Sequence, residues 1–162
     1  MQEHLIVDGN NALHAIPELA RELRNNREYA RESLLHLLEP LVGITSSLLT
    51  VVFDGKGGPL TVSKHKELEA FTVIYSSSTQ GADGVIERML MASKQPEKLV
   101  VVTNDNLIRN CAFAHGASAM RVEEVSKKLD FAIERVKSIR CKTSKKSNEN
   151  GAKFENKIPF PD

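Results

Sequence analysis

Tryptophan is absent from this sequence, and cysteine and aromatic residues are scarce. The 162 residues include two Cys, six Phe and two Tyr. Two cysteines are too few for a disulfide framework or a zinc site built from thiolates, so we expect plain thiols at Cys111 and Cys141 and a reducing compartment. With so few aromatic residues, no platform on which single-stranded bases could stack is recognisable in the sequence.

Long apolar runs are missing as well. A membrane-spanning helix needs ~20 consecutive apolar residues, and no stretch approaches this length. The first apolar run, residues 5–7, is not preceded by a basic segment and ends at Asp8, unlike a secretory signal. We therefore expect a cytoplasmic protein without membrane contact. The length of the chain predicts one domain.

Positive and negative charges nearly balance over the whole chain, with a formal net charge of +1, but they are unevenly distributed along it. From Lys137 onward, seven Lys or Arg face three acidic residues, which leaves residues 1–136 with a net charge of −3. We divide the chain into a domain over residues 1–138 and a basic, flexible tail over residues 139–162. The tail is interpreted either as a solvated terminus or as an arm that contacts phosphates through Lys142, Lys145 and Lys146.

Short apolar runs rich in β-branched residues alternate with segments of helical periodicity, which is typical of an α/β fold with a parallel sheet covered on both faces. The predicted strands are residues 5–8, 48–53, 71–75, 99–103 and 118–122. The predicted helices are residues 11–23, 27–38, 82–93, 106–114 and 123–138. The glycine-rich start and basic end of residues 54–66 predict a long loop, with Lys56, Lys64 and Lys66 as candidate contacts to an RNA backbone.

Acidic residues recur where the predicted strands end. Asp8 ends the first strand, Asp54 follows the second, Asp105 follows the fourth, and Asp83 opens the helix after the third. Ligands bind outside the carboxyl ends of parallel strands, so these four carboxylates should meet at one edge of the sheet. Glu87 lies one helical turn after Asp83 and is a possible fifth member.

So many carboxylates in one cleft repel one another unless a cation lies between them. Oxygen ligands without histidine or thiolate favour Mg²⁺ or Mn²⁺, and such ions support hydrolysis of phosphodiesters. Each aspartate taken alone is better explained as a turn or helix-cap residue, but four of them at equivalent positions of the sheet favour a metal-binding cleft. Three polar neighbours are candidates to position a substrate or to cap helices: Asn11, Thr103 and Asn104.

Four segments together resemble the YacP-like branch of the NYN domain family, within the PIN-like nuclease superfamily. They are LIVDGNN at residues 5–11, VVFDG at 51–55, GADGVIER at 81–88 and VVTND at 101–105. The resemblance covers residues 4–136 and leaves the basic tail outside. Asn10 stands where this branch usually has an aromatic residue such as Tyr.

The resemblance implies a three-layer PIN-like sandwich with a mainly parallel sheet of five strands in the order 3-2-1-4-5. It implies a Mg²⁺- or Mn²⁺-dependent endoribonuclease in which Asp8, Asp83 and Asp105 are catalytic and hold metal. Glu87 and Asp54 match further acidic positions, and Asn11 matches the asparagine of the first motif. Some relatives act on messenger RNA at the ribosome, so RNA and the ribosome are the expected partners of a monomer or weak homodimer.

Three other functions remain open. A binding module for RNA or a ribosomal partner would need no turnover, but it would be expected to lack one of the acidic residues. A phosphatase with Asp8 as nucleophile usually has a second acid at the position of Asn10. A phospho-receiver centred on Asp54 would need a lysine after a later strand, and none is present there.

Overall fold

A single six-stranded sheet forms the centre of the protein. The computed structural model describes residues 2–45, 47–55 and 57–155, with side chains up to residue 140. The strand order is β3-β4-β2-β1-β5-β6, and every neighbouring pair is parallel except β3 with β4. The strands are β1 His4–Asp8, β2 Leu48–Phe53, β3 Thr61–Lys64, β4 Phe71–Tyr75, β5 Leu99–Val102 and β6 Ser118–Met120.

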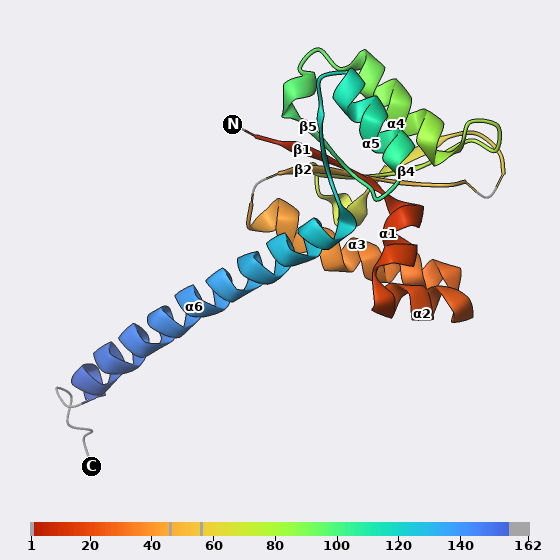
Figure 1. Cartoon of the computed structure of the whole chain (residues 1–162). Coiled ribbons are helices and arrows are strands. Elements are labelled where there is room, and N and C mark those ends of the chain that lie inside the picture. The colour runs from red at the N-terminus through yellow and green to blue at the C-terminus, as the bar shows by residue number, and fades with distance from the viewer. Residues whose placement is uncertain (1, 46, 56, 156–162) are drawn as a thin grey trace.

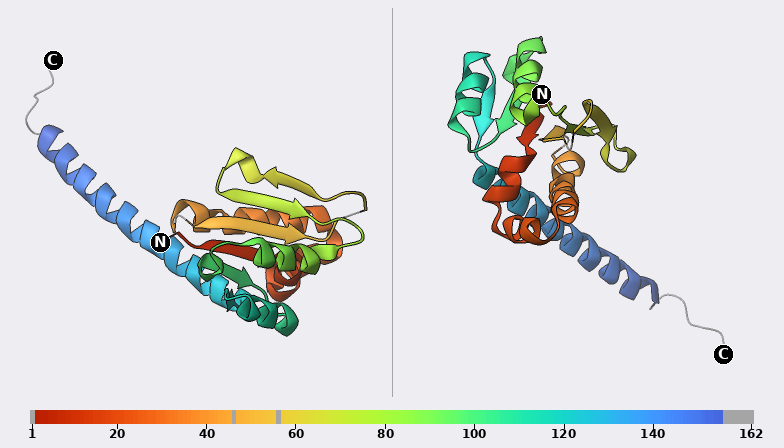
Figure 2. Two further views of the ribbon diagram at one scale, coloured as in Figure 1. Left: turned by 90° about the horizontal axis from the view of Figure 1, so that it is seen from above. Right: turned by 90° about the vertical axis from the view of Figure 1, so that its right-hand side faces the viewer.

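Helices cover both faces of the sheet and make three layers (Figures 1 and 2). One face carries α1 Gly9–Ala15, α2 Pro17–Asn25, α3 Arg27–Gly43 and the start of α6 Val122–Glu155. The other face carries α4 Gly81–Ala92 and α5 Asn106–Ala114. Two short 3₁₀ turns, η1 His65–Glu67 and η2 Pro96–Lys98, lead into β4 and β5. The far end of α6 extends away from the sheet (Figure 1).

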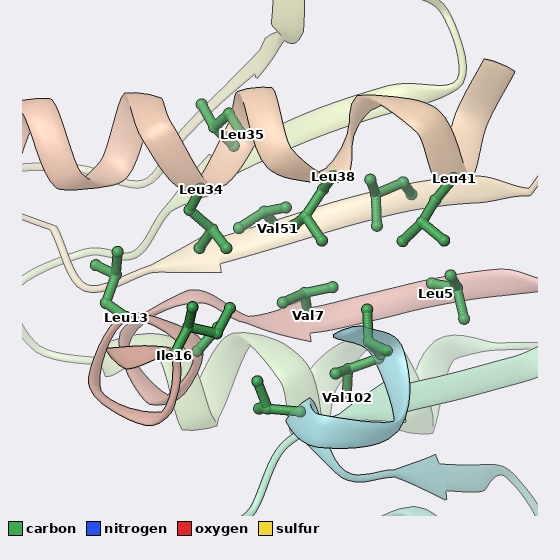
Figure 3. Close-up of a cluster of buried hydrophobic side chains, with 14 of the residues drawn as sticks. Leu5, Val7, Leu13, Ile16, Leu34, Leu35, Leu38, Leu41, Val51 and Val102 are labelled. Carbon is green, nitrogen blue, oxygen red and sulfur yellow. The ribbon is translucent and has the colours of Figure 1, made fainter. Parts of the chain in front are cut away.

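The alternation of side chains along the strands divides the core between the two faces. Leu5 and Val7 of β1 point to the face covered by α3, where they meet Leu34 and Leu38 (Figure 3). Ile6, between them, points to the opposite face and packs with the side chains of α4 and α5. Because both faces of the central strands are buried, these strands are continuously apolar and were recognisable in the sequence.

The predicted sheet order is confirmed for the five predicted strands, which form the order β4-β2-β1-β5-β6. The structure adds a sixth strand, β3, inside the segment predicted to be a loop. All four residues of β3 are exposed, so the strand has no buried apolar residue that would reveal it in the sequence. It pairs antiparallel with β4 at the edge of the sheet.

The predicted helix over residues 11–23 is wrong in one respect, since the structure has two helices there. Pro17 is the first residue of α2, and Ile16 before it is extended, with φ −90° and ψ 116°. A proline disfavours the helical conformation of the preceding residue and provides no N–H for the α1 ladder, so the chain turns at this point.

Two other helices are longer than predicted. The sequence predicted an end near Leu38 for α3, but this helix continues through Pro40 to Gly43 because Leu41 is fully buried in the core. The sequence predicted an end at Ser138 for α6, and the structure continues this helix to Glu155. The boundary of the compact domain at residue 138 and the flexibility of the tail stay predictions.

Candidate active site

Asp8 is the central acidic residue of the site. It is the last residue of β1, and its side chain caps α1: Oδ1 accepts a hydrogen bond from the backbone N–H of Asn11 at 3.4 Å. Oδ2 accepts a hydrogen bond from the hydroxyl of Thr103 at 3.2 Å. Asp8 is 5% exposed and Thr103 is fully buried, so the Asp8 carboxylate is held in a fixed, buried position at the carboxyl end of β1.

Burial raises the pKa of Asp8 from 3.8 to about 6. The hydrogen bonds from Asn11 and Thr103 act in the opposite direction, while the negative charges of Asp83 and Asp54 raise the pKa further. Part of the Asp8 population is therefore protonated near neutral pH, and a cation beside it would favour the charged form. Of the four aspartates, Asp8 is buried, Asp105 is half-buried, and Asp54 and Asp83 are exposed.

Asp54 joins two elements that carry the other acidic residues. It follows β2, and its Oδ1 accepts a hydrogen bond from the backbone N–H of Ala82 at 2.8 Å. Its Oδ2 accepts a hydrogen bond from the side-chain amide of Asn10. Because Ala82 lies in the first turn of α4, Asp54 fixes the helix start that presents Asp83. Asp54 is thus placed to orient the site, with both oxygens already hydrogen-bonded.

Asp83 in the first turn of α4 and Asp105 at the start of α5 lie close enough for their charges to interact. Partial burial raises the pKa of Asp83, and the negative charges of Asp105 and Asp54 raise it further. Asp105 caps α5, since its Oδ1 accepts a hydrogen bond from the N–H of Leu107 at 2.9 Å. Its own N–H donates to Oγ1 of Thr103 at 3.1 Å, so Thr103 links Asp105 to Asp8.

Glu87 lies one turn further along α4 and is exposed. Together with Asp83 it lines a cavity of about 150 Å³ between α4 and α5, which also includes Leu107 and Cys111. The charge of Glu87 contributes to a raised pKa of the Cys111 thiol, after burial as the larger cause. Glu87 therefore faces the groove between the two helices, beside Asp83.

The two predicted positioning residues Asn11 and Asn104 bind each other and the start of α6. The side-chain oxygen of Asn11 accepts a hydrogen bond from the N–H of Asn104 at 2.9 Å. The side-chain oxygen of Asn104 accepts from the N–H of Val122 at 3.0 Å, and its amide donates to Glu123 at 3.0 Å. These contacts fix the loop after β5 against α1 and α6. Sequence reasoning did not identify Glu123, although an acidic residue in the first turn of a helix is a common signal.

Arg31 is a second residue that sequence reasoning missed. It lies on the buried face of α3 and is 3% exposed, and its Nη2 donates to the backbone carbonyl of Asp54 at 3.2 Å. Its guanidinium lies 5.4 Å from the ring centroids of both Phe53 and Tyr75. The sequence did contain a signal for this residue. Arg31 stands next to Ala30 and one turn before Leu34 and Leu35, at a position where the helical pattern predicts a buried apolar side chain.

The predicted RNA-contacting lysines are placed in three different ways. Lys64 donates to the carbonyl of Glu69 at 2.9 Å and to the hydroxyl of Thr72 at 3.0 Å. Lys66 forms an ion pair with Glu39 at 2.8 Å. Both lysines lie at the β3 edge of the sheet with partners of their own. Lys56 and the side chains of Lys142, Lys145 and Lys146 lie outside the described residues.

The carboxylates at the sheet edge suit a hydrated divalent ion better than a tightly chelated one. Among the residues described, no group of three His, Cys, Asp or Glu side chains is close enough to hold one ion by itself. Mg²⁺ keeps several waters and commonly uses only one or two carboxylates, so this spacing is compatible with it. Burial raises the pKa values of Asp8 and Asp83, and the negative charges of the neighbouring aspartates raise both further, so a cation placed here would stabilise the charged carboxylates.

A larger cavity lies away from these carboxylates. It has a volume of about 680 Å³ and lies between α2, α3 and the start of α6, with an apolar wall that includes Ile16, Leu37 and Ile133. Its lining includes Glu18, Glu123 and Asp130, but no three acidic side chains among the described residues are close enough together to hold a metal ion. In the part of the chain that the structure describes, no helix has the length and apolar character to cross a membrane.

Comparison with known proteins gives one consistent result. Residues 5–159 match the model of the YacP-like NYN domain. The chain is 27% identical to the protein YacP of Bacillus subtilis over 147 residues, which is 88% of this chain and 84% of that protein.

Two solved structures are similar. They are crystal structures of Rae1 (YacP) from Bacillus subtilis. A mutant of that protein matches with a TM-score of 0.73 and 25% identity over 88% of this chain and 85% of that one. The other structure matches with a TM-score of 0.71 and 25% identity over 96% and 90% of the two chains.

The similarity extends further along the chain than the sequence motifs indicated. The resemblance was expected to end at residue 136 and to leave the basic segment outside, whereas the family match continues to residue 159. That expectation was wrong, because the last of the four motifs ends at residue 105 and α6 has no short motif of its own. The basic segment is part of what this chain shares with its relatives.

Proposed function

Since this chain belongs to the YacP-like NYN domain family, whose members are nuclease-like and RNA-related, we propose that it is a metal-dependent endoribonuclease. One observation carries the proposal: a carboxylate buried to 5% exposure at the end of β1 lies within electrostatic reach of Asp54 and Asp83. Among the described side chains, no Lys or Arg is within 4 Å of Asp8, Asp83 or Asp105. Negative charges in this arrangement favour binding of a cation.

Asp8, Asp83 and Asp105 are the residues that would hold Mg²⁺ or Mn²⁺, one or two of them directly and the rest through metal-bound water, with Glu87 at the margin and Asp54 acting through water. When bound, the ion supplies a more acidic water and offsets the negative charge that develops on a phosphodiester. Asp8 then remains ionised at neutral pH, because a neighbouring cation lowers the pKa of a carboxyl group.

The surrounding residues keep the carboxylates in place. Thr103 donates to Asp8 and accepts from the backbone of Asp105, so one buried hydroxyl fixes two acidic residues. Asp54 fixes the start of α4 through Ala82. Asn11 and Asn104 fix the loop that carries Asp105. Pre-positioned groups of this kind lower the cost of reorganisation during the reaction.

The proposed substrate is RNA, cleaved to give 5′-phosphate and 3′-hydroxyl ends, with the ribosome as a possible site of action. We also propose that the protein acts in the cytoplasm as a monomer or weak homodimer. The basic residues of α6, a helix that extends away from the sheet (Figure 2), are candidates for contacts to the RNA backbone. Such contacts position RNA and do not select its sequence.

The test is cleavage of a mixed-sequence RNA by purified protein with Mn²⁺ or Mg²⁺, with EDTA as control. We expect cleavage that Asp8→Asn and Asp105→Asn abolish while both variants remain folded. Asp130→Asn, which changes an exposed aspartate on α6, is the matched control and should keep full activity. The same assay on translating ribosomes follows if free RNA is not cleaved. Absence of cleavage in both assays would overturn the proposal in favour of a binding module.

A further inference from the structure

A small basic niche lies beside the acidic residues, on the α3 side of the end of β1. Its wall is formed by side chains from α1, α2 and the start of α3, and it encloses about 40 Å³. One water needs about 10–15 Å³ on this measure, so the niche has room for a group of a few heavy atoms. The lining residues are Asn10, Leu13, His14, Leu23, Arg27 and Arg31.

The hydrogen-bonding capacity of Arg31 is largely unused. This side chain is 3% exposed, yet its Nε and Nη1 have no hydrogen-bond partner among the described residues. Its nearest acidic group is Glu28, whose Oε1 lies 3.7 Å from Nη1 and is beyond hydrogen-bond distance. A buried cation with free donors is unfavourable unless a ligand or water fills the place of the missing acceptors.

Positive charge is concentrated at the same niche. Arg27 lies one turn before Arg31 on α3, and burial together with the charge of Arg27 lowers the pKa of Arg31. Arg27 and Arg31 lie one helical turn apart beside the niche, and an anion bound there would relieve the repulsion between them. Guanidinium groups donate charge-assisted hydrogen bonds to phosphate oxygens, and these are stronger than hydrogen bonds to a neutral carbonyl or water.

The niche and the acidic cluster share Asn10. The amide of Asn10 donates to Asp54, while the same side chain lines the niche. Arg31 donates to the backbone carbonyl of Asp54 from the other side. A nucleic acid strand whose reacting phosphate lies at the carboxylates would therefore pass the niche with an adjacent phosphate.

We propose that Arg31, Arg27 and Asn10 form a binding site for a backbone phosphate of RNA next to the one that is cleaved. This inference rests on the proposed function for the identity of the strand. A non-bridging oxygen of a phosphodiester accepts from one of the two free donors of Arg31, Nε or Nη1, and the exposed side chain of Arg27 adds a second positive charge. The site contacts no base. It therefore increases the affinity for RNA and fixes the position of the strand relative to the carboxylates, without a preference for sequence.

The direct test is NMR of the arginine Nε–H signals in EDTA, where no metal-dependent cleavage occurs. The probes are the dinucleoside monophosphate UpU, uridine and inorganic phosphate, with Arg31→Gln used to assign the signal. We expect UpU to shift the Arg31 signal and uridine to leave it unchanged. If UpU has no effect, the niche holds water only and the proposal is overturned. If only inorganic phosphate shifts the signal, the niche is a site for the free ion and the RNA assignment is overturned.

A second test measures affinity for single-stranded RNA over a series of KCl concentrations, again in EDTA. Each lost phosphate contact on a single strand reduces the slope of log Kd against log salt by about 0.7, so Arg27→Ala should lower the slope by this amount. Arg21→Ala, which changes an exposed arginine of α2 outside the niche, is the matched control. An unchanged slope in Arg27→Ala would overturn the site. RNA binding with this slope change but without cleavage would refute only the nuclease proposal, and cleavage with an unchanged slope would refute only the niche.

Discussion

Thr103 and Asp8 are 95 positions apart in the sequence, and the hydroxyl of Thr103 donates a hydrogen bond to Oδ2 of Asp8 at 3.2 Å. The contact is possible because β1 and β5 are parallel neighbours in the sheet, so their carboxyl ends meet. The same Oγ1 accepts from the N–H of Asp105 at 3.1 Å. One buried hydroxyl thus connects two of the proposed metal-holding residues.

Replacing Thr103 with valine should shift the pH dependence of cleavage upward. The hydroxyl stabilises the charged form of Asp8, so its loss raises the pKa of Asp8 further above about 6. At any pH on the acidic limb of the rate profile a larger fraction of Asp8 is then protonated, so this limb moves to higher pH. Thr103→Ser keeps the hydroxyl and is the control. Identical profiles for the valine and serine variants would contradict the role of this hydrogen bond.

Asp8→Asn should stabilise the metal-free protein at pH 7. The pKa of Asp8 is raised in the fold from 3.8 to about 6, so the unfolded chain loses this proton first as the pH rises, and stability falls between these values. Since one pKa unit corresponds to about 1.4 kcal/mol, the expected gain in unfolding free energy is about 3 kcal/mol at pH 7 and close to zero at pH 3. Urea unfolding in EDTA at both pH values measures it. A loss of stability at pH 7 would show that burial of the charge is not the dominant effect.

Glu39→Gln should destabilise the protein at neutral pH and have little effect in acid. Hydrogen bonds from Lys66 and His65 lower the pKa of Glu39 from 4.5 to about 2. The stabilisation is therefore present above pH 4.5 and is lost as the pH falls towards 2. Partial exposure reduces the expected effect to about 1 kcal/mol. Thermal unfolding of both proteins at pH 7 and pH 2.5 tests the sign, and an equal difference at both pH values would refute it.

Gly55→Ala should unfold or strongly destabilise the protein. A Cβ atom at this position would lie 1.8 Å from the backbone oxygen of Ser76, so β2 and β4 could not keep their approach at the site. A clash with backbone costs at least 1–3 kcal/mol, roughly the range for overpacking. Gly43→Ala is the control, because a Cβ there meets nothing within 4 Å. Comparable melting temperatures for the two variants would contradict the packing described here.

The features that could be predicted from the sequence were those with strong local patterns. The strands buried on both faces are continuously apolar, and α5 has the predicted bounds because Asp105 caps it and His115 follows it. The features that were missed depend on tertiary contacts. β3 is wholly exposed and exists through its pairing with β4, and α3 passes Pro40 because Leu41 is buried.

The acidic residues of the site were predictable for the same reason, since each follows a recognisable strand or begins a recognisable helix. Their roles were not. Asp54 was a candidate metal ligand, but its oxygens bind Ala82 and Asn10, which only the fold brings near. Arg31 is an arginine in an apolar stretch, and its relation to Asp54 depends on how α3 packs against β2.

The most direct test of the central claim is a titration of ¹⁵N-labelled protein with Mn²⁺, followed by paramagnetic broadening of the backbone amide signals. We predict that signals around Asp8, Asp83 and Asp105 broaden first, and that Asp8→Asn removes this selectivity while Asp130→Asn retains it. Excess Mg²⁺ should restore the signals by competition. Broadening that is confined to acidic residues of α6, or that is unchanged in Asp8→Asn, would contradict a metal site at the carboxyl end of β1.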